Sequence, residues 1–170
     1  MGIVPISYLS PLLAVIIGIA HAGLAPVIVV AGVKPNLVLV AVVLVTSLIG
    51  LLPGITWAFA AGLAANLLVG EPLGSVPLVL LFVSVAVAGA GRVAGGLVWI
   101  FPIAAALLGS ILADMGSLIV SQLVTDAAAA SPPFDILVRA AILNAAIVAL
   151  LLYPARAIAQ RYTPEEAPAW

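Results

Sequence analysis

Two apolar stretches in the first half of the chain are separated by only a Pro-Gly pair. They cover residues 37–52 and 55–69, and the pair is Pro53-Gly54. The core of a lipid bilayer has no water to satisfy backbone N–H and C=O groups, so each stretch must be helical and the turn must lie at the surface. The sequence therefore predicts a membrane hairpin with almost no loop.

The composition extends this conclusion to the whole chain. Of its 170 residues, 66% are hydrophobic and 6% are charged, whereas about a quarter of the residues of an ordinary soluble domain are charged. We therefore expect an integral membrane protein. The chain has no cysteine, which excludes disulfides and thiolate metal sites, and its net charge of -1 with five scattered Lys and Arg residues argues against nucleic-acid binding.

The apolar runs and the residues that break them predict an all-α, polytopic bundle of about six transmembrane helices. We expect one domain over residues 1–162 and a short polar tail over residues 163–170. The fifth segment, at about 1.5 Å per residue, would reach roughly 43 Å, so it must tilt or project from a core of about 30 Å. The six predicted segments are residues 6–22, 36–52, 54–69, 75–90, 97–125 and 134–158.

The basic residues predict the orientation of this bundle. An even number of spans places both termini on one side of the membrane, together with Arg92, Arg156 and Arg161, while Lys34 and Arg139 lie on the other side. Cytoplasmic loops carry an excess of Lys and Arg. We therefore expect a multi-pass protein of the bacterial inner membrane with both termini in the cytoplasm.

Asp114 is the best candidate for a buried ionisable group, because it lies well inside the fifth segment. A carboxylate at membrane depth costs about 2.5 to 3.5 kcal/mol on insertion scales, so its environment must compensate it. It can be protonated, face a water-filled cavity, or pair with Arg139. Two roles remain open for Asp114: it can act as a proton relay or ligand-binding group, or its role can be purely structural. Arg92, after the fourth segment, is a further candidate for contact with a partner.

Asn66 and Asn144 are uncharged amides inside the third and sixth segments. Hydrogen bonds between membrane helices average about 0.6 kcal/mol, and we expect both amides to hold helices together. Small residues also recur every four positions, which lets helix backbones approach closely, and we interpret this spacing as ordinary packing within the bundle. The clearest example is Ala14, Gly18 and Ala22.

No residue pattern predicts catalysis, a cofactor or a metal ion. His21 is the only histidine, and the chain has neither an HExxH pair nor a GxSxG nucleophile motif. Ala20-His21-Ala22 has the form of a signal-peptide cleavage site, but no Lys or Arg precedes Lys34. We therefore expect the first segment to be a retained membrane helix that ends near His21, and the protein not to be an enzyme.

The opening hairpin resembles the MreD family of rod shape-determining membrane proteins. The last predicted span, residues 144–154 followed by Arg156, is also similar to that family's last span. Members commonly carry Asp where this chain has Asn66, and often where it has Asn36, so the chain keeps hydrogen bonding there but lacks charge. In the hairpin, the resemblance rests on Lys34-Pro35-Asn36-Leu37, Pro53-Gly54, residues 57–68 and Glu71-Pro72-Leu73-Gly74.

The resemblance implies a non-enzymatic scaffold of the bacterial elongation machinery, which builds peptidoglycan along the cell. Such a protein would bind MreC and act alongside MreB, RodA and a class B penicillin-binding transpeptidase, surrounded by membrane lipids. The alternative is the substrate-binding S-component of an energy-coupling-factor vitamin transporter, which should have a polar pocket facing outward. The charged residues available for such a pocket are Lys34, Glu71, Asp126, Asp135 and Arg139.

Overall fold

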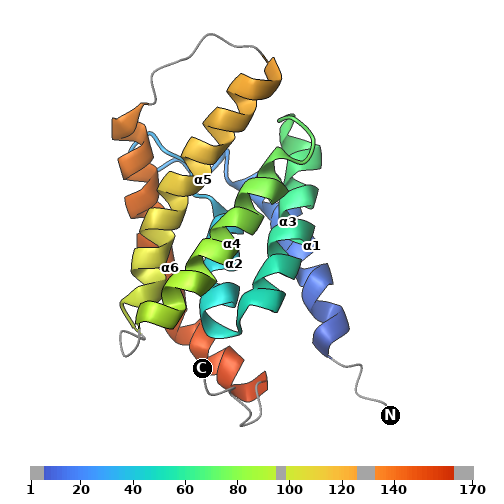
Figure 1. Ribbon diagram of the computed structural model, residues 1–170, viewed down its shortest axis with the longest axis vertical. Coiled ribbons are helices and arrows are strands. Elements are labelled where there is room, and N and C mark those ends of the chain that lie inside the picture. The colour runs from blue at the N-terminus through green and yellow to red at the C-terminus, as the bar shows by residue number, and fades with distance from the viewer. Residues whose placement is uncertain (1–5, 95–98, 126–132, 163–170) are drawn as a thin grey trace.

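The structure, a computed structural model, describes residues 6–94, 99–125 and 133–162, and in these residues it is an all-helical bundle (Figure 1). The predicted tail, the predicted start of the fifth segment at Leu97, and Asp126 lie outside the described residues. The first turn of α1 and the last turn of α6 lie on the same side of the bundle. The six helices are α1 (Ile6–Leu24), α2 (Leu37–Leu48), α3 (Leu51–Val69), α4 (Ser75–Ala94), α5 (Phe101–Thr125) and α6 (Phe134–Tyr162).

Four of these helices, α3 to α6, are long and apolar enough to cross a membrane, which makes the chain a multi-pass membrane protein. The other two are apolar but shorter over their described residues, Ser10–Leu24 in α1 and Leu37–Leu48 in α2. With 12 residues, α2 measures about 18 Å at 1.5 Å per residue, against a hydrocarbon core of about 30 Å. Span length therefore supports four of the six predicted crossings directly.

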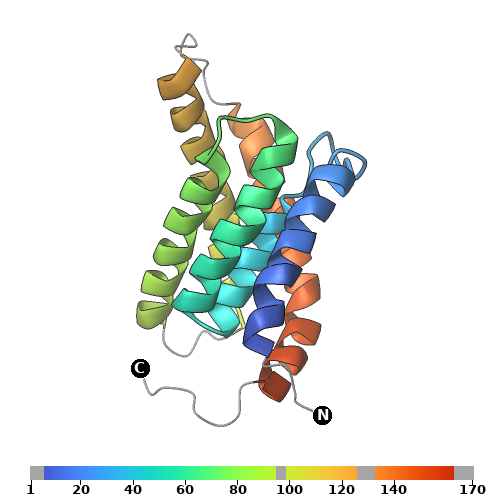
Figure 2. The same ribbon diagram turned by 90° about the vertical axis from the view of Figure 1, so that its right-hand side faces the viewer.

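The short helix α2 lies at the centre of the bundle, where it contacts all five other helices (Figure 2). Leu39, Val42 and Val43 on this helix are fully buried. Other helices shield its backbone from lipid, so its ends need not reach either membrane surface. Residues 25–36, which connect it to α1, run inward from one end of the bundle to meet its first turn.

The turn of the opening hairpin lies a few residues earlier than the Pro53-Gly54 break that the sequence predicts. Helix α2 ends at Leu48, and Gly50 makes the turn with a φ of 124°, a conformation that favours glycine. Pro53 is the third residue of α3. The first N–H groups of a helix have no partner within the helix, so a proline costs little at this position.

Helices α4 and α6 both run a few residues past their predicted ends. Helix α4 continues from residue 90 through Gly91 and Arg92 to Ala94, and α6 continues from residue 158 to Tyr162. A glycine costs only about 1 kcal/mol in a helix. Leaving the helix would expose several backbone groups, which is costly near lipid. The predicted ends were therefore too early.

Small residues bring α1 against α3, as their four-residue spacing predicts. Ala14 is fully buried, and a Cβ atom added at Gly18 would lie only 2.4 Å from the carbonyl oxygen of Ala61. One polar contact joins the same two helices, because the Trp57 indole N–H donates to Ser10 Oγ at 2.7 Å. The prediction that this spacing serves packing within the bundle is confirmed.

Candidate functional site

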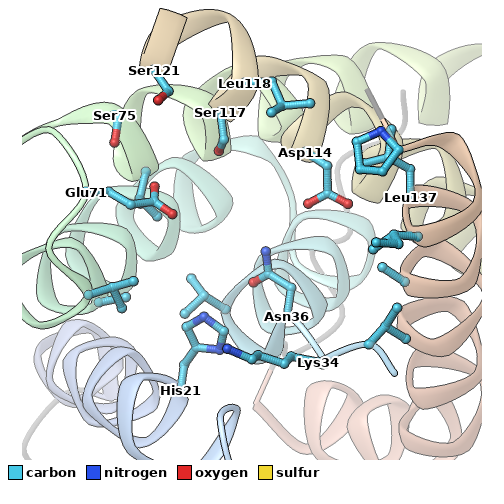
Figure 3. A pocket seen from close by; sticks show the side chains of 18 of the residues that line it. His21, Lys34, Asn36, Glu71, Ser75, Asp114, Ser117, Leu118, Ser121 and Leu137 are labelled. Atoms are coloured by element: carbon cyan, nitrogen blue, oxygen red, sulfur yellow. The ribbon is translucent and has the colours of Figure 1, made fainter. Parts of the chain in front are cut away.

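A polar pocket of about 590 Å³ lies at the end of the bundle away from the start of α1 and the end of α6 (Figures 1 and 3). All six helices contribute to it, together with the segment before α2 and the loop between α3 and α4. Its charged and amide-bearing lining residues are His21, Lys34, Asn36, Glu71 and Asp114.

The shortness of α2 makes room for this pocket. Asn36 caps the N-terminus of α2, since its Oδ1 accepts the Leu39 N–H at 3.0 Å, and Asn36 itself lines the pocket. The neighbouring helices α3 and α5 extend further toward this end of the bundle. The space above the first turn of α2 is therefore enclosed by longer helices and is only partly filled by residues 25–36.

One face of α5 forms a wall of the pocket. Asp114, Ser117, Leu118 and Ser121 all line it, and their spacing of three, four and seven residues places them on one side of a helix. Asp114 is among the candidates predicted from the sequence, whereas Ser117 and Ser121 are not. The signal was available, because three polar residues at helical spacing in an otherwise apolar segment predict a shared polar face.

Asp114 is partly buried and faces this pocket rather than Arg139 (Figure 3). Arg139 instead pairs with Asp135 one turn earlier on α6, with its Nε 3.1 Å from Asp135 Oδ1. The proposed pairing of Asp114 with Arg139 is therefore wrong, because a partner within its own helix takes the guanidinium. Within the described parts of the chain, the Asp114 carboxylate has no hydrogen-bond or ion-pair partner.

A buried hydrogen-bond network lies beneath the pocket and joins three helices. Asn144 of α6, which is 2% exposed, accepts the Asn36 N–H on its Oδ1 at 2.8 Å and donates from Nδ2 to Ser110 Oγ at 3.0 Å. Ser110 in turn donates to the Ala106 carbonyl at 2.8 Å. Asn144 therefore fixes the start of α2 against α5 and α6.

Asn66 supports the pocket from another side. This residue is 1% exposed. Its Oδ1 accepts the Gly74 N–H at 2.6 Å, and its Nδ2 donates to the Glu71 carbonyl at 3.3 Å. The amide therefore holds the loop between α3 and α4, which carries Glu71 and leads into Ser75 at the start of α4.

The remaining predicted residues lie away from the pocket. Arg139 is on the surface of α6 near the same end, where it also donates to the Ala31 carbonyl at 3.4 Å. Arg92 is exposed in the last turn of α4, at the opposite end of the bundle. At that end the Arg156 guanidinium also stacks on the Trp99 ring, 3.9 Å from its centroid.

The pocket has the chemistry of a binding site. His21, Glu71 and Asp114 line it, but no three His, Asp or Glu side chains in the described residues lie close enough together to hold a metal ion. The buried Nδ1 of His21 has no hydrogen-bond partner, so it positions no serine hydroxyl for attack. Charged groups of both signs, hydroxyls and apolar walls suit recognition of a polar ligand.

No family model, curated protein or solved structure matches the chain. The assignment of a function therefore rests on the residues of the hairpin, the packing of the bundle and the pocket.

Proposed function

We propose that this protein is a non-enzymatic scaffold of the bacterial elongation machinery, of the MreD type, which binds MreC in the inner membrane. In this proposal α1 and α2 complete six membrane-embedded helices, although α2 alone is too short to cross. Both termini lie in the cytoplasm, on the side of Arg92 and Arg156, and the pocket opens on the outer side.

The observation that carries this proposal is the role of three amides that lie in the stretches resembling the family, two of them at positions where members commonly carry Asp. Asn36, Asn66 and Asn144 are the amides that fix the start of α2 and the loop before α4. Hydrogen bonds of this kind determine how helices pack inside a membrane. The Oδ1 atoms of Asn36 and Asn66 accept backbone N–H groups, which the Asp of family members can also accept, so the same positions can specify the bundle in both.

A scaffold must offer its partners surfaces, and here these are lipid-facing helix sides and short loops. Helices α1 and α4 both present large apolar side chains outward. A single-span partner such as MreC can pack against such a surface by van der Waals contact. The exposed residues include Leu12, Leu13 and Ile16 on α1 and Leu78, Phe82 and Val85 on α4.

Co-purification of two tagged proteins tests the proposal. The chain and MreC from the same organism are expressed together, solubilised in mild detergent, captured through one tag and detected through the other. We expect a stable complex that survives size-exclusion chromatography. A single-span membrane protein of equal length from another pathway serves as the control. Independent elution of the chain and MreC, at the same level as this control, overturns the proposal.

The pocket favours a second candidate, the substrate-binding subunit of an energy-coupling-factor transporter. Such a subunit needs a polar cavity at the outer end of a small helical bundle, and the pocket lined by Lys34, Glu71 and Asp114 has this form. The two candidates differ in their partners. Capture of paired ATP-binding cassette ATPases from native membranes favours the transporter subunit, and capture of MreC favours the scaffold.

A further inference from the structure

The charged groups of the pocket are separated by sign. Glu71 lies in the α3–α4 loop and Asp114 on α5, and both carboxylates line the pocket. Lys34, the basic residue of the pocket lining, lies below them in Figure 3. A ligand that suits both signs of charge must carry a positive group at one end and a negative group at the other.

Three polar groups in the pocket also lack partners within the described residues. Ser75 is only 5% exposed, and neither its Oγ nor the buried His21 Nδ1 makes a hydrogen bond. The Asp114 carboxylate likewise has no hydrogen bond or ion pair. Buried polar groups are almost always paired, and leaving one unpaired costs about 1 to 3 kcal/mol. Ser75 Oγ and His21 Nδ1 are buried groups of this kind, and the partly buried Asp114 carboxylate is the unpaired group that a ligand in the pocket can reach.

We propose that this pocket binds a zwitterion with an ammonium group and a phosphate group. The ammonium group faces the Asp114 carboxylate on α5, with Glu71 in the neighbouring α3–α4 loop, and the phosphate group contacts the exposed Lys34 at the mouth. The volume of about 590 Å³ falls in the usual range for ligand sites, about 300 to 1,000 Å³. Apolar lining residues such as Val69 and Leu137 suit the uncharged part of the ligand.

This chemistry has two sources in a membrane: a free phosphoethanolamine compound and the headgroup of phosphatidylethanolamine. The inference rests on the pocket alone and holds whichever partner the protein binds. Its test uses the purified chain without partners, so it can fail without affecting the scaffold proposal.

The thermal midpoint of the purified protein is measured in two series. In detergent, the free probe is glycerophosphoethanolamine, compared with ethanolamine and glycerol phosphate, which each carry one of the two charges. In nanodiscs, phosphatidylethanolamine is compared with phosphatidylglycerol, which lacks the ammonium group. We expect saturable stabilisation by at least one zwitterionic probe, with the single-charge compounds at least tenfold weaker. Stabilisation only in nanodiscs identifies the lipid as the source, and stabilisation in detergent identifies a free solute.

Three variants locate the binding. Asp114→Asn is expected to weaken the response at least tenfold and Lys34→Gln about threefold or more, because each removes one charge that faces the ligand. Asp135→Asn, a carboxylate on α6 that is not part of the pocket lining, is the matched control and should not change the response. A purely structural Asp114 would shift the midpoint without probe and leave the response unchanged. That result, or no saturable response to either zwitterionic probe, overturns the proposal.

Discussion

Removal of the Asn144 side chain should destabilise the bundle more than removal of any lipid-facing side chain on the same helix. Asn144→Ala deletes two hydrogen bonds, one to the Asn36 N–H and one to Ser110. At about 0.6 kcal/mol each, these account for about 1.2 kcal/mol. The Asn36 N–H then lacks its acceptor, which adds about 1 kcal/mol or more. The expected loss in the free energy of unfolding is therefore about 2 to 3 kcal/mol.

Reversible unfolding in mixed micelles of dodecyl maltoside and sodium dodecyl sulfate measures this loss. Leu150→Ala on α6 is the control, because Leu150 is 77% exposed and its removal should change the free energy by less than about 0.5 kcal/mol. Ser110→Ala removes two bonds, the one from Asn144 and the one to the Ala106 carbonyl, and should cost about 1 kcal/mol. The double variant Asn144→Ala, Ser110→Ala should cost about 0.6 kcal/mol more than Asn144→Ala alone, less than the sum of the two single losses, because the shared bond is lost in either variant and only the Ser110–Ala106 bond is added. Equal effects of Asn144→Ala and Leu150→Ala would refute the network.

Three further predictions concern packing, the α3–α4 loop and the end of the bundle near Arg156. Gly18→Ala should cost about 1 to 3 kcal/mol in the same unfolding assay, because the new Cβ would meet the α3 backbone. Gly23→Ala, where a Cβ would have nothing within 4 Å, is the control and should be neutral or stabilising. Equal effects of the two substitutions would contradict the close approach of α1 to α3. Asn66→Asp should preserve slow hydrogen exchange at the Gly74 amide, since a carboxylate still accepts that N–H, whereas Asn66→Leu should abolish the slow exchange. Slow exchange at Gly74 in the Leu variant would count against the hydrogen bond between Asn66 and Gly74. Replacing Arg156 by Gln should lower the free energy of unfolding by about 0.5 to 1 kcal/mol, and adding Trp99→Leu should have little further effect; additive losses would exclude the stacking contact.

The sequence was sufficient to predict the helices, because their signal is local. Apolar runs and their breakers located all six helices of the described chain, with start and end positions wrong by a few residues. The errors at Pro53 and Gly91 share one cause. Glycine and proline favour a helix end. A proline in the first turn of a helix costs little, however, and a helix near lipid continues past a glycine because ending there would expose backbone groups.

The pocket depends on a property that no local pattern contains. It exists because α2 is shorter than its neighbours and begins deep in the bundle, and helix lengths alone do not reveal which helix is central. The spacing of Asp114, Ser117 and Ser121 predicts a polar face on α5, but not that His21 and Glu71 lie opposite it. Arg139 is the opposite case, because its partner Asp135 lies four residues earlier, a spacing at which opposite charges on a helix are expected to pair.

Purification of the tagged chain from its native membranes, followed by identification of the proteins that elute with it, tests the proposed function most directly. The scaffold proposal predicts MreC as the most enriched specific partner, with other elongation proteins alongside it, and no such enrichment for a tagged membrane protein of unrelated function. Recovery of transporter ATPases without any cell-wall protein would contradict it.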